Sequence, residues 1–308
     1  MGPVEKVELP DGLNVVIWGL RHKRSTHRYI HSSWFKMLKR SGIPVVWVDD
    51  ELKNQSVVSD KSIVIAVNTA ARHLPKVPGA RYVLHNIDPS PFLSCLTERF
   101  HLLTIQVWSK PVLSDPQVQE ILPCVALDDT NHVLYQPWGT PFAEYEWVRE
   151  PLKARRGVEY WIGSVWNNSS NQGNASMIPE WRDVLGSHGI TLRKVPYGWP
   201  DNKIGYGGLV RRSSIAAAPV GDWQRENGYL PCRLFKNVSF GAVPVGNSPI
   251  YGRLFSDSAI LGPSLKDTVI QYLELSITER HERVEFAQAC MRQYTYEAAF
   301  KRILDQVL

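Results

Sequence analysis

Short apolar runs alternate with polar stretches along the first half of the chain. Runs of this length, bounded by turn residues, are typical of buried strands. Between the first two runs, Ser25 or Thr26 is placed to cap a helix that continues to Lys39 and stops before Gly42. The pattern predicts a parallel sheet covered by helices, opening with a complete βαβ unit. The strands predicted in this half cover 14–18, 44–48, 62–67, 81–84, 102–107 and 132–135.

The same alternation begins again after residue 157. The segment 136–157 loses the periodicity, gains proline and glycine, and contains the basic residues Lys153, Arg155 and Arg156, so we interpret it as a linker. With 308 residues, the chain is long enough for two domains. The predicted elements of this half are strands at 158–162, 191–195, 214–218 and 242–245, and helices at 179–187, 202–211, 230–240, 265–276, 278–292 and 295–307.

We therefore predict an α/β protein with two Rossmann-like domains that face each other across a cleft. The first domain is expected at 1–150 and the second at 151–290, with a final helix at 291–308.

Composition narrows the classes of partner. Hydrophobic residues make up 44% of the chain and charged residues 21%, which is ordinary for a soluble globular protein. The net charge of +5 favours an anionic ligand, but the cations are dispersed, so nucleic acid is not expected. The four cysteines are far apart and form no CxxC pair, which predicts neither a disulfide framework nor a zinc site. No apolar stretch is long enough to span a bilayer, and we expect a cytoplasmic protein.

The loop after the first strand is the densest basic segment. It reads GLRHKRSTHRYIHSSW from residue 19 and contains no GxGxxG fingerprint, so an NAD site is not expected there. Because ligands of open α/β sheets bind beyond the carboxyl ends of strands, we expect Arg21, His22 and Arg28 to contact a substrate, namely the acceptor of a transferred group. His27 and His31 are four residues apart, and either is a candidate general base. The alternative is a solvated helix start whose histidines only pack.

A second candidate group follows the strand predicted at 81–84. His85 is expected to contact the acceptor, and Asp88 is a further candidate base, acting directly or by orienting a histidine. Asn86 and Asp88 precede Pro89 and Ser90, so they are equally well explained as turn and helix-capping residues.

The helix predicted at 230–240 carries two cations on neighbouring turns. Leu234 and Val238 belong to its apolar face, whereas Arg233 and Lys236 are three residues apart and can converge on one anion. The free N–H groups at the start of the helix would favour a negatively charged ligand. The segment therefore predicts a diphosphate site. The alternative is an ordinary amphipathic helix with a solvated arginine and lysine.

This segment resembles the donor-site motif of fucosyltransferase-like and related glycosyltransferases with the GT-B architecture. The matching positions are Tyr229, Arg233, Leu234, Phe235, Gly241, Pro244 and Val245. The resemblance implies a nucleotide-diphosphate sugar on the second domain, with Tyr229 and Leu234 beside it, and a last helix that returns to the first domain. Where many such proteins have a glutamate that holds sugar or ribose hydroxyls, this chain has Pro231 and Cys232.

Other residues of the second domain are candidates for the donor site. Ser164 lies in a small-residue turn after the strand at 158–162 and is suited to phosphate. Tyr197 and Trp199 follow the strand at 191–195, where either is expected to stack on a nucleotide base or to pack on its own domain. Asp222 follows the strand at 214–218 and is a candidate for binding sugar or ribose hydroxyls.

These residues predict a glycosyltransferase that moves a hexosyl, deoxyhexosyl or pentosyl group from a nucleotide-diphosphate sugar to a hydroxyl of a glycan. No DxD motif appears, because Asp49-Asp50 and Asp128-Asp129 are adjacent pairs typical of caps and turns, so neither a metal nor another cofactor is expected. An inverting route with a His or Asp base is the expectation. The alternatives are a non-catalytic protein that binds a sugar or nucleotide sugar, and a nucleotide-sugar epimerase.

Overall fold

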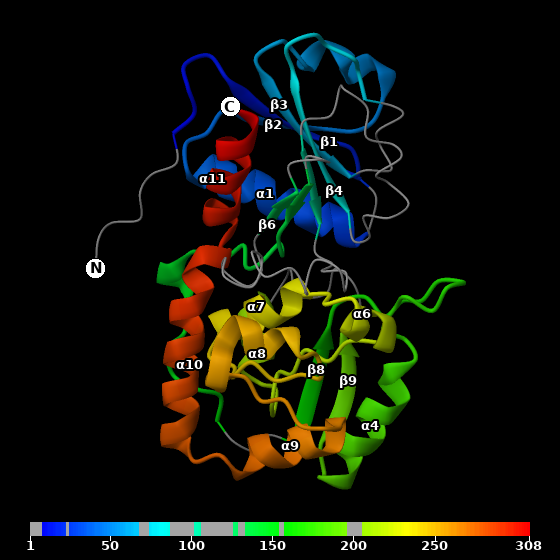
Figure 1. Cartoon of the computed structure of the whole chain (residues 1–308), viewed down its shortest axis with the longest axis vertical. Coiled ribbons are helices and arrows are strands. Elements are labelled where there is room, and N and C mark those ends of the chain that lie inside the picture. The colour runs from blue at the N-terminus through cyan, green and yellow to red at the C-terminus, as the bar shows by residue number, and fades with distance from the viewer. Residues whose placement is uncertain are drawn as a thin grey trace. The chain divides into compact units, whose positions relative to one another are not determined.

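The computed structural model describes residues 8–22, 25–67, 74–86, 102–105, 126–128, 133–153, 157–195 and 205–308. These form two compact units, drawn in Figure 1. Among the described residues, unit 1 comprises those within 1–106, 127–136 and 296–308, and unit 2 comprises those within 107–126 and 137–295. The segment 137–150, which the sequence suggested as the end of the first domain, thus groups with unit 2, and the last helix groups with unit 1.

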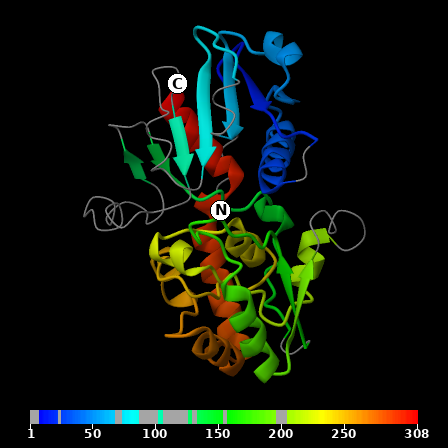
Figure 2. The ribbon, with the colours of Figure 1, turned by 90° about the vertical axis from the view of Figure 1, so that its right-hand side faces the viewer.

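Unit 1 is built on a sheet whose strand order is β2-β1-β3-β4-β5-β7-β6 among the described residues. Neighbouring strands from β2 to β7 pair in parallel, and Figure 2 shows several of them as arrows pointing the same way. The central strands β1 and β3 are buried on both faces, as expected for a parallel sheet covered by helices. The strands are β1 (Asn14–Trp18), β2 (Val45–Val48), β3 (Ser62–Val67), β4 (Arg81–Asn86), β5 (Leu102–Ile105), β6 (Ala126–Asp128) and β7 (Val133–Tyr135).

Two helices far apart in the sequence pack together in unit 1, α1 (Thr26–Arg40) and α11 (Tyr296–Val307). Ser25 caps α1, because its hydroxyl accepts a hydrogen bond from the Arg28 N–H at 3.1 Å. The fully buried Trp34 of α1 contacts Tyr296 and Phe300 of α11, with ring centroids 4.9 and 5.9 Å away. Aromatic packing therefore fixes the C-terminal helix on this unit.

Unit 2 has a layer of extended chain with a hydrophobic core on each face. Strands β8 (Val158–Ile162) and β9 (Thr191–Val195) pair in parallel within it. Trp161 and Ile215 point into the core that contains α4 (Met177–Ser187) and α9 (Leu265–Glu274), whereas their neighbours Ile162 and Ala216 point into the core that contains α5 (Gly205–Val210). This alternation gives the unit its Rossmann-like layers.

The helices of unit 2 agree with the predicted periodicity where they are long, and α10 runs along the side of the unit in Figure 1. Two short helices, α6 (Asp222–Glu226) and α8 (Ile250–Phe255), were not predicted, because helices of this length carry little periodicity, whereas the equally short α5 lies within the helix predicted at 202–211. All helices in the described ranges are too short or too polar to cross a membrane. The helices are α4 (Met177–Ser187), α5 (Gly205–Val210), α6 (Asp222–Glu226), α7 (Cys232–Ser239), α8 (Ile250–Phe255), α9 (Leu265–Glu274) and α10 (Ile277–Met291).

The strands predicted at 214–218 and 242–245 are wrong as regular strands. The buried Glu159 carboxylate of β8 accepts hydrogen bonds from the N–H groups of Ile215, Ala216 and Ala217 at 2.9–3.0 Å. These donors are therefore not available to a strand ladder, and Ala216 adopts a positive φ of 55°. In the second segment, an isolated parallel bridge from Val245 to Ile260 replaces a strand. Both segments remain buried, which is why the apolar pattern suggested strands.

Candidate functional site

Arg233 of α7 lies at the carboxyl end of β8. Its guanidinium stacks on Trp161, with the Cζ atom 3.7 Å from the ring centroid, and Nη2 donates a hydrogen bond to the Pro219 carbonyl at 2.9 Å. The Nη1 atom lies 3.6 Å from the point where a Cβ on Gly163 would stand. Only 7% of the residue is exposed, and its buried Nε–H finds no hydrogen-bond acceptor among the described residues. Burial lowers the pKa of Arg233, so the site holds a largely desolvated cation with an unused donor.

Lys236 is also turned inward, one helical turn further along α7. It is 6% exposed, and its Nζ lies 4.6 Å from the centroid of the Tyr206 ring. The solvated arginine and lysine considered as an alternative are therefore wrong for this helix. The two cations stack on different aromatic rings, and both lie close enough to the Tyr229 phenol to affect its pKa.

The loops at the carboxyl edge of unit 2 hold two of the predicted donor residues. Ser164 follows β8, and its carbonyl accepts a hydrogen bond from the Asn174 amide at 3.1 Å. Asp222 begins α6 and forms an ion pair with Arg225 at 3.0 Å, with 77% of the Asp222 side chain exposed. Asp222 lines a cavity of about 230 Å³ between α4 and α6. Ser164 therefore lies just after the carboxyl end of β8, and Asp222 lies at the start of α6.

The structure describes two further residues of the predicted donor-site motif, Leu234 and Tyr229. Leu234 is 1% exposed and packs in the interior, whereas Tyr229 precedes α7 and its pKa is raised by burial of the phenol. Tyr197 and Trp199 lie outside the described residues.

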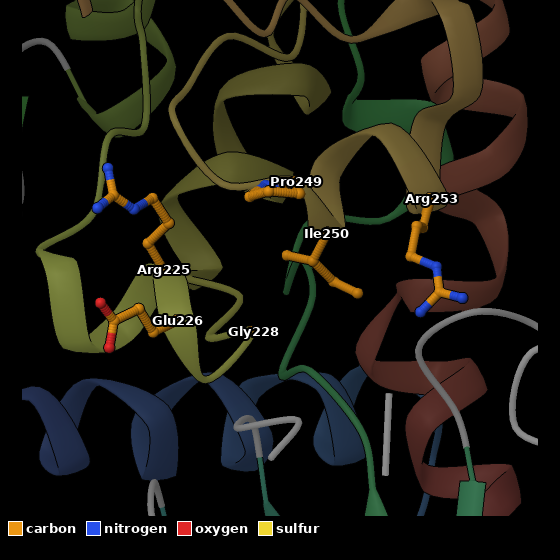
Figure 3. Close-up of a pocket in the computed structure, with 6 residues that line it drawn as sticks. All are labelled: Arg225, Glu226, Gly228, Pro249, Ile250 and Arg253. Carbon is orange, nitrogen blue, oxygen red and sulfur yellow. The ribbon is translucent and has the colours of Figure 1, made fainter. Parts of the chain in front are cut away.

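A larger cavity of about 370 Å³ opens between the end of α6 and the start of α8, and Figure 3 shows the residues that line it. Arg225 and Arg253 stand on opposite sides of Pro249 and Ile250 in this view, while Glu226 extends from the end of α6. The arginines come from α6 and α8, the two helices that were too short to predict. Glu226 supplies a carboxylate close in sequence to the donor-site motif, in which Pro231 and Cys232 stand where a glutamate was expected. Its position three residues before Tyr229 was the feature of the sequence that could have identified it as a candidate donor-site residue.

In unit 1, the predicted acceptor residues lie around the carboxyl ends of β1 and β2. The Arg21 N–H donates to Asp49 at 2.8 Å, and its Nη1 donates to the Trp47 carbonyl at 2.9 Å. His22 faces Asp49 at 3.7 Å with 79% of its side chain exposed. Arg28 donates through Nε to the Arg21 carbonyl at 2.9 Å. These hydrogen bonds hold Arg21 and Arg28 in place, while the Arg21 and His22 side chains stay exposed.

Three histidines meet at the same edge. His31 and His85 are buried, and their Nε2 atoms are 2.8 Å apart. The Nδ1 atom of His31 lies 3.1 Å from the Gly19 carbonyl. His27, one turn before His31, is half-buried and packs edge to face on His85 with ring centroids 5.5 Å apart. Both ring nitrogens of His31 are thus engaged, and His27 is the member with access to solvent.

Burial governs the charge of the inner pair. It lowers the pKa of His31 to about 4, assisted by repulsion from His27, and it lowers the pKa of His85 well below its usual range. Both imidazoles are therefore neutral at pH 7. In the described ranges, no three His, Cys, Asp or Glu side chains come close enough to hold a metal ion. Asp88 lies outside those ranges.

The folded protein is expected to lose stability on acidification because of this pair. Between pH 6.5 and about 4 the unfolded chain binds the proton at His31 and the folded chain does not, so the free energy of unfolding decreases as the pH falls. From pH 7 to pH 5, His31 alone should account for about 2 kcal/mol. Urea unfolding of wild type and His31→Gln at both pH values measures this. An equal loss in the two proteins would exclude His31 as its source.

No family model and no curated protein sequence matches the chain. Two solved structures match over nearly their whole length. One is an alpha-glucosyltransferase in complex with UDP and a 13-mer DNA containing an HMU base, with 11% identity, 96% of this chain and 99% of that chain covered, and a TM-score of 0.55. The other is the DNA-modifying enzyme beta-glucosyltransferase, with 12% identity, 95% and 100% covered, and a TM-score of 0.52. These likenesses show the GT-B fold with two Rossmann-like domains.

Proposed function

We propose that the protein is a glycosyltransferase that uses a nucleotide-diphosphate sugar as donor and a hydroxyl group as acceptor. The observation that carries the proposal is Arg233, a buried cation with an unused donor at the carboxyl end of β8 in a GT-B fold. Ligands of open α/β sheets bind at this edge. A diphosphate oxygen there would satisfy the guanidinium and offset the cost of its burial.

The donor would extend from Arg233 into the cavity between α6 and α8. That cavity has the size of a small-molecule site and combines an apolar base, Pro249 and Ile250, with the polar groups of Arg225, Glu226 and Arg253. Glu226 is suited to hold sugar hydroxyls. Ser164, Asp222 and Tyr229 would line the same donor site, as would Tyr197 and Trp199, and Lys236 would add positive potential from within the unit. UDP is the first nucleotide to examine, because one structure of similar fold contains it.

The acceptor would bind to unit 1, at the exposed side chains of Arg21 and His22 and the half-buried Arg28. His27 would take the proton from the acceptor hydroxyl as the new glycosidic bond forms. The bond between the sugar and the diphosphate breaks in the same step, and its electron pair leaves with the nucleoside diphosphate, which Arg233 stabilises. No metal is needed in this scheme. The expected result is that EDTA leaves turnover unchanged.

The arginines of the cavity provide a separate prediction. Arg253→Gln is expected to weaken donor affinity by about fivefold, because a partly solvated charged hydrogen bond contributes about 1 kcal/mol. Arg225→Gln should act in the same direction and also break the ion pair with Asp222. Arg182→Gln, on the exposed face of α4, is the matched control. Isothermal titration with the best nucleotide sugar measures the effect, and equal affinities in all three variants would remove the cavity from the donor site.

The proposed function is tested by a thermal-shift screen with UDP, GDP and ADP, their sugars, and the corresponding monophosphates. A ligand that binds only the folded chain raises its melting temperature. We expect one nucleotide and its sugar to do so, and the diphosphate to do so more than the monophosphate. Absence of a shift with every diphosphate would contradict the proposal.

A glycan is proposed as acceptor, because the sequence lacks a long basic run. Of the two glucosyltransferases of similar fold described above, one is in complex with a 13-mer DNA and the other is a DNA-modifying enzyme. Parallel incubations with oligosaccharides and with duplex DNA therefore follow, with sugar transfer read by mass spectrometry. Transfer to DNA alone would replace the glycan by nucleic acid and leave the donor site intact.

A further inference from the structure

The hydrogen bonds around His31 fix the proton on each ring of the inner pair. The Gly19 carbonyl can only accept, and it lies 3.1 Å from Nδ1 of His31 and 3.0 Å from the Trp47 indole nitrogen. Nδ1 of His31 must therefore carry a hydrogen. Since the ring is buried and neutral, Nε2 of His31 is a bare acceptor.

The second ring follows from the first. Nε2 of His85 lies 2.8 Å from the bare Nε2 of His31, so it must be the donor. A neutral His85 then has its lone pair at Nδ1. A second proton on His31 would place two donors against each other at this contact, and a second proton on His85, at Nδ1, would charge a buried ring. The pair therefore adopts a single combination of neutral tautomers, with the proton of His31 on Nδ1 and that of His85 on Nε2.

The pair also determines the surroundings of His27. The His85 ring contacts His27, with centroids 5.5 Å apart, and its centroid lies 5.0 Å from that of His31. His85 comes from β4, where it pairs with Val67 of β3 and Thr104 of β5, so the sheet fixes its backbone. His27 belongs to the first turn of α1. The contact between them joins the helix start to the sheet at its carboxyl edge.

We propose that the buried His31–His85 pair is a tautomer lock that positions His27 for proton transfer from the acceptor. The inference rests on the proposed function. His31 and His85 are positioning residues, and His27 is the base. Because the locked pair is neutral, no buried charge opposes the positive charge that His27 gains as it removes the acceptor proton.

The lock itself is tested without turnover. Histidine-selective 15N labelling of the full chain and two-bond 15N–1H correlation at pH 7 separate the two neutral tautomers from the imidazolium. We expect the proton of His31 on Nδ1 and that of His85 on Nε2. The opposite tautomer on either ring, or a charged ring, would overturn the lock.

The positioning role is tested by His85→Leu and His85→Gln. Leucine leaves Nε2 of His31 without a donor, whereas the glutamine amide can replace that donor. We expect His85→Leu to lower kcat by about 100-fold, the scale of general base catalysis, with donor KM unchanged, and His85→Gln to recover part of kcat. Unchanged kcat in a folded His85→Leu would refute positioning. If His85→Leu does not fold, the kcat of His85→Gln decides. A substantial kcat in His85→Gln supports positioning, and a complete loss of kcat contradicts it. Failure of the wild type to bind any nucleotide diphosphate would instead reject the proposed function and leave the tautomer result standing.

Discussion

Arg233→Met is expected to weaken the binding of a nucleoside diphosphate by about 10- to 150-fold, which corresponds to about 1.5–3 kcal/mol for the loss of a charge-assisted hydrogen bond. Methionine keeps an unbranched stem that can pack on Trp161 but offers no donor to the ligand. The loss should exceed that of any single change in the neighbouring cavity, because Arg233 is 7% exposed and its contact with an anion is the least screened. Isothermal titration of the folded variant gives the affinity.

Arg280→Met is the matched control for this experiment. Arg280 is 3% exposed, its Cζ lies 4.6 Å from the Tyr272 ring centroid, and its Nε–H also has no acceptor among the described residues. It belongs to α10, however, and donates to the Tyr272 carbonyl at the end of α9. We therefore expect Arg280→Met to change the melting temperature and not the nucleotide affinity. Equal losses of affinity in the two variants would mean that Arg233 acts only through the fold.

Glu159→Gln is expected to lower the free energy of unfolding by about 3 kcal/mol, because it places an amide N–H₂ against a buried backbone donor. The carboxyl group has two oxygens that accept from Ile215, Ala216 and Ala217. Burial raises the pKa of this carboxyl to about 7, and the three N–H groups act in the opposite direction. Protonation leaves both oxygens able to accept, whereas glutamine has a single acceptor oxygen. Urea unfolding at pH 7 measures the difference.

Glu180→Gln provides the comparison for Glu159. Glu180 is exposed in the first turn of α4, and its replacement should change stability by less than about 0.5 kcal/mol. A loss in Glu159→Gln no larger than this would show that the segment 214–218 holds its conformation without the carboxylate.

The fold could be predicted where periodicity is strong. The strands at 14–18, 62–67 and 191–195 and the helix that ends near Lys39 agree with the structure within a residue or so. Glu159 shows what local pattern misses. A glutamate in the sequence VEYWI looks like the solvent side of a strand, yet its carboxylate bonds to donors 56 to 58 residues away. No local rule describes that contact.

In the candidate site, too, local patterns could be predicted from the sequence and long-range contacts could not. The spacing of His27 and His31 predicted one shared face, and the position of His85 after a strand predicted the same edge of the sheet. The hydrogen bond between His31 and His85 depends on how α1 packs on β4, which sequence alone does not supply. In α7, the polar positions suggested a solvated face, but even Asn237 and Ser239 are buried. The cations therefore have aromatic neighbours that the helical pattern did not reveal.

The central claim is that the protein breaks the bond between a sugar and a nucleoside diphosphate and transfers the sugar. The most direct measurement is 31P NMR of the protein incubated with individual nucleotide sugars and an oligosaccharide mixture in the presence of EDTA. Free nucleoside diphosphate has a terminal phosphate that a nucleotide sugar lacks, so the two are resolved. We predict that one nucleotide sugar is converted to its nucleoside diphosphate, faster with acceptor than without, and that Arg233→Met slows this conversion. Nucleotide sugars that all remain intact, or that interconvert with the diphosphate still attached, would contradict a transferase.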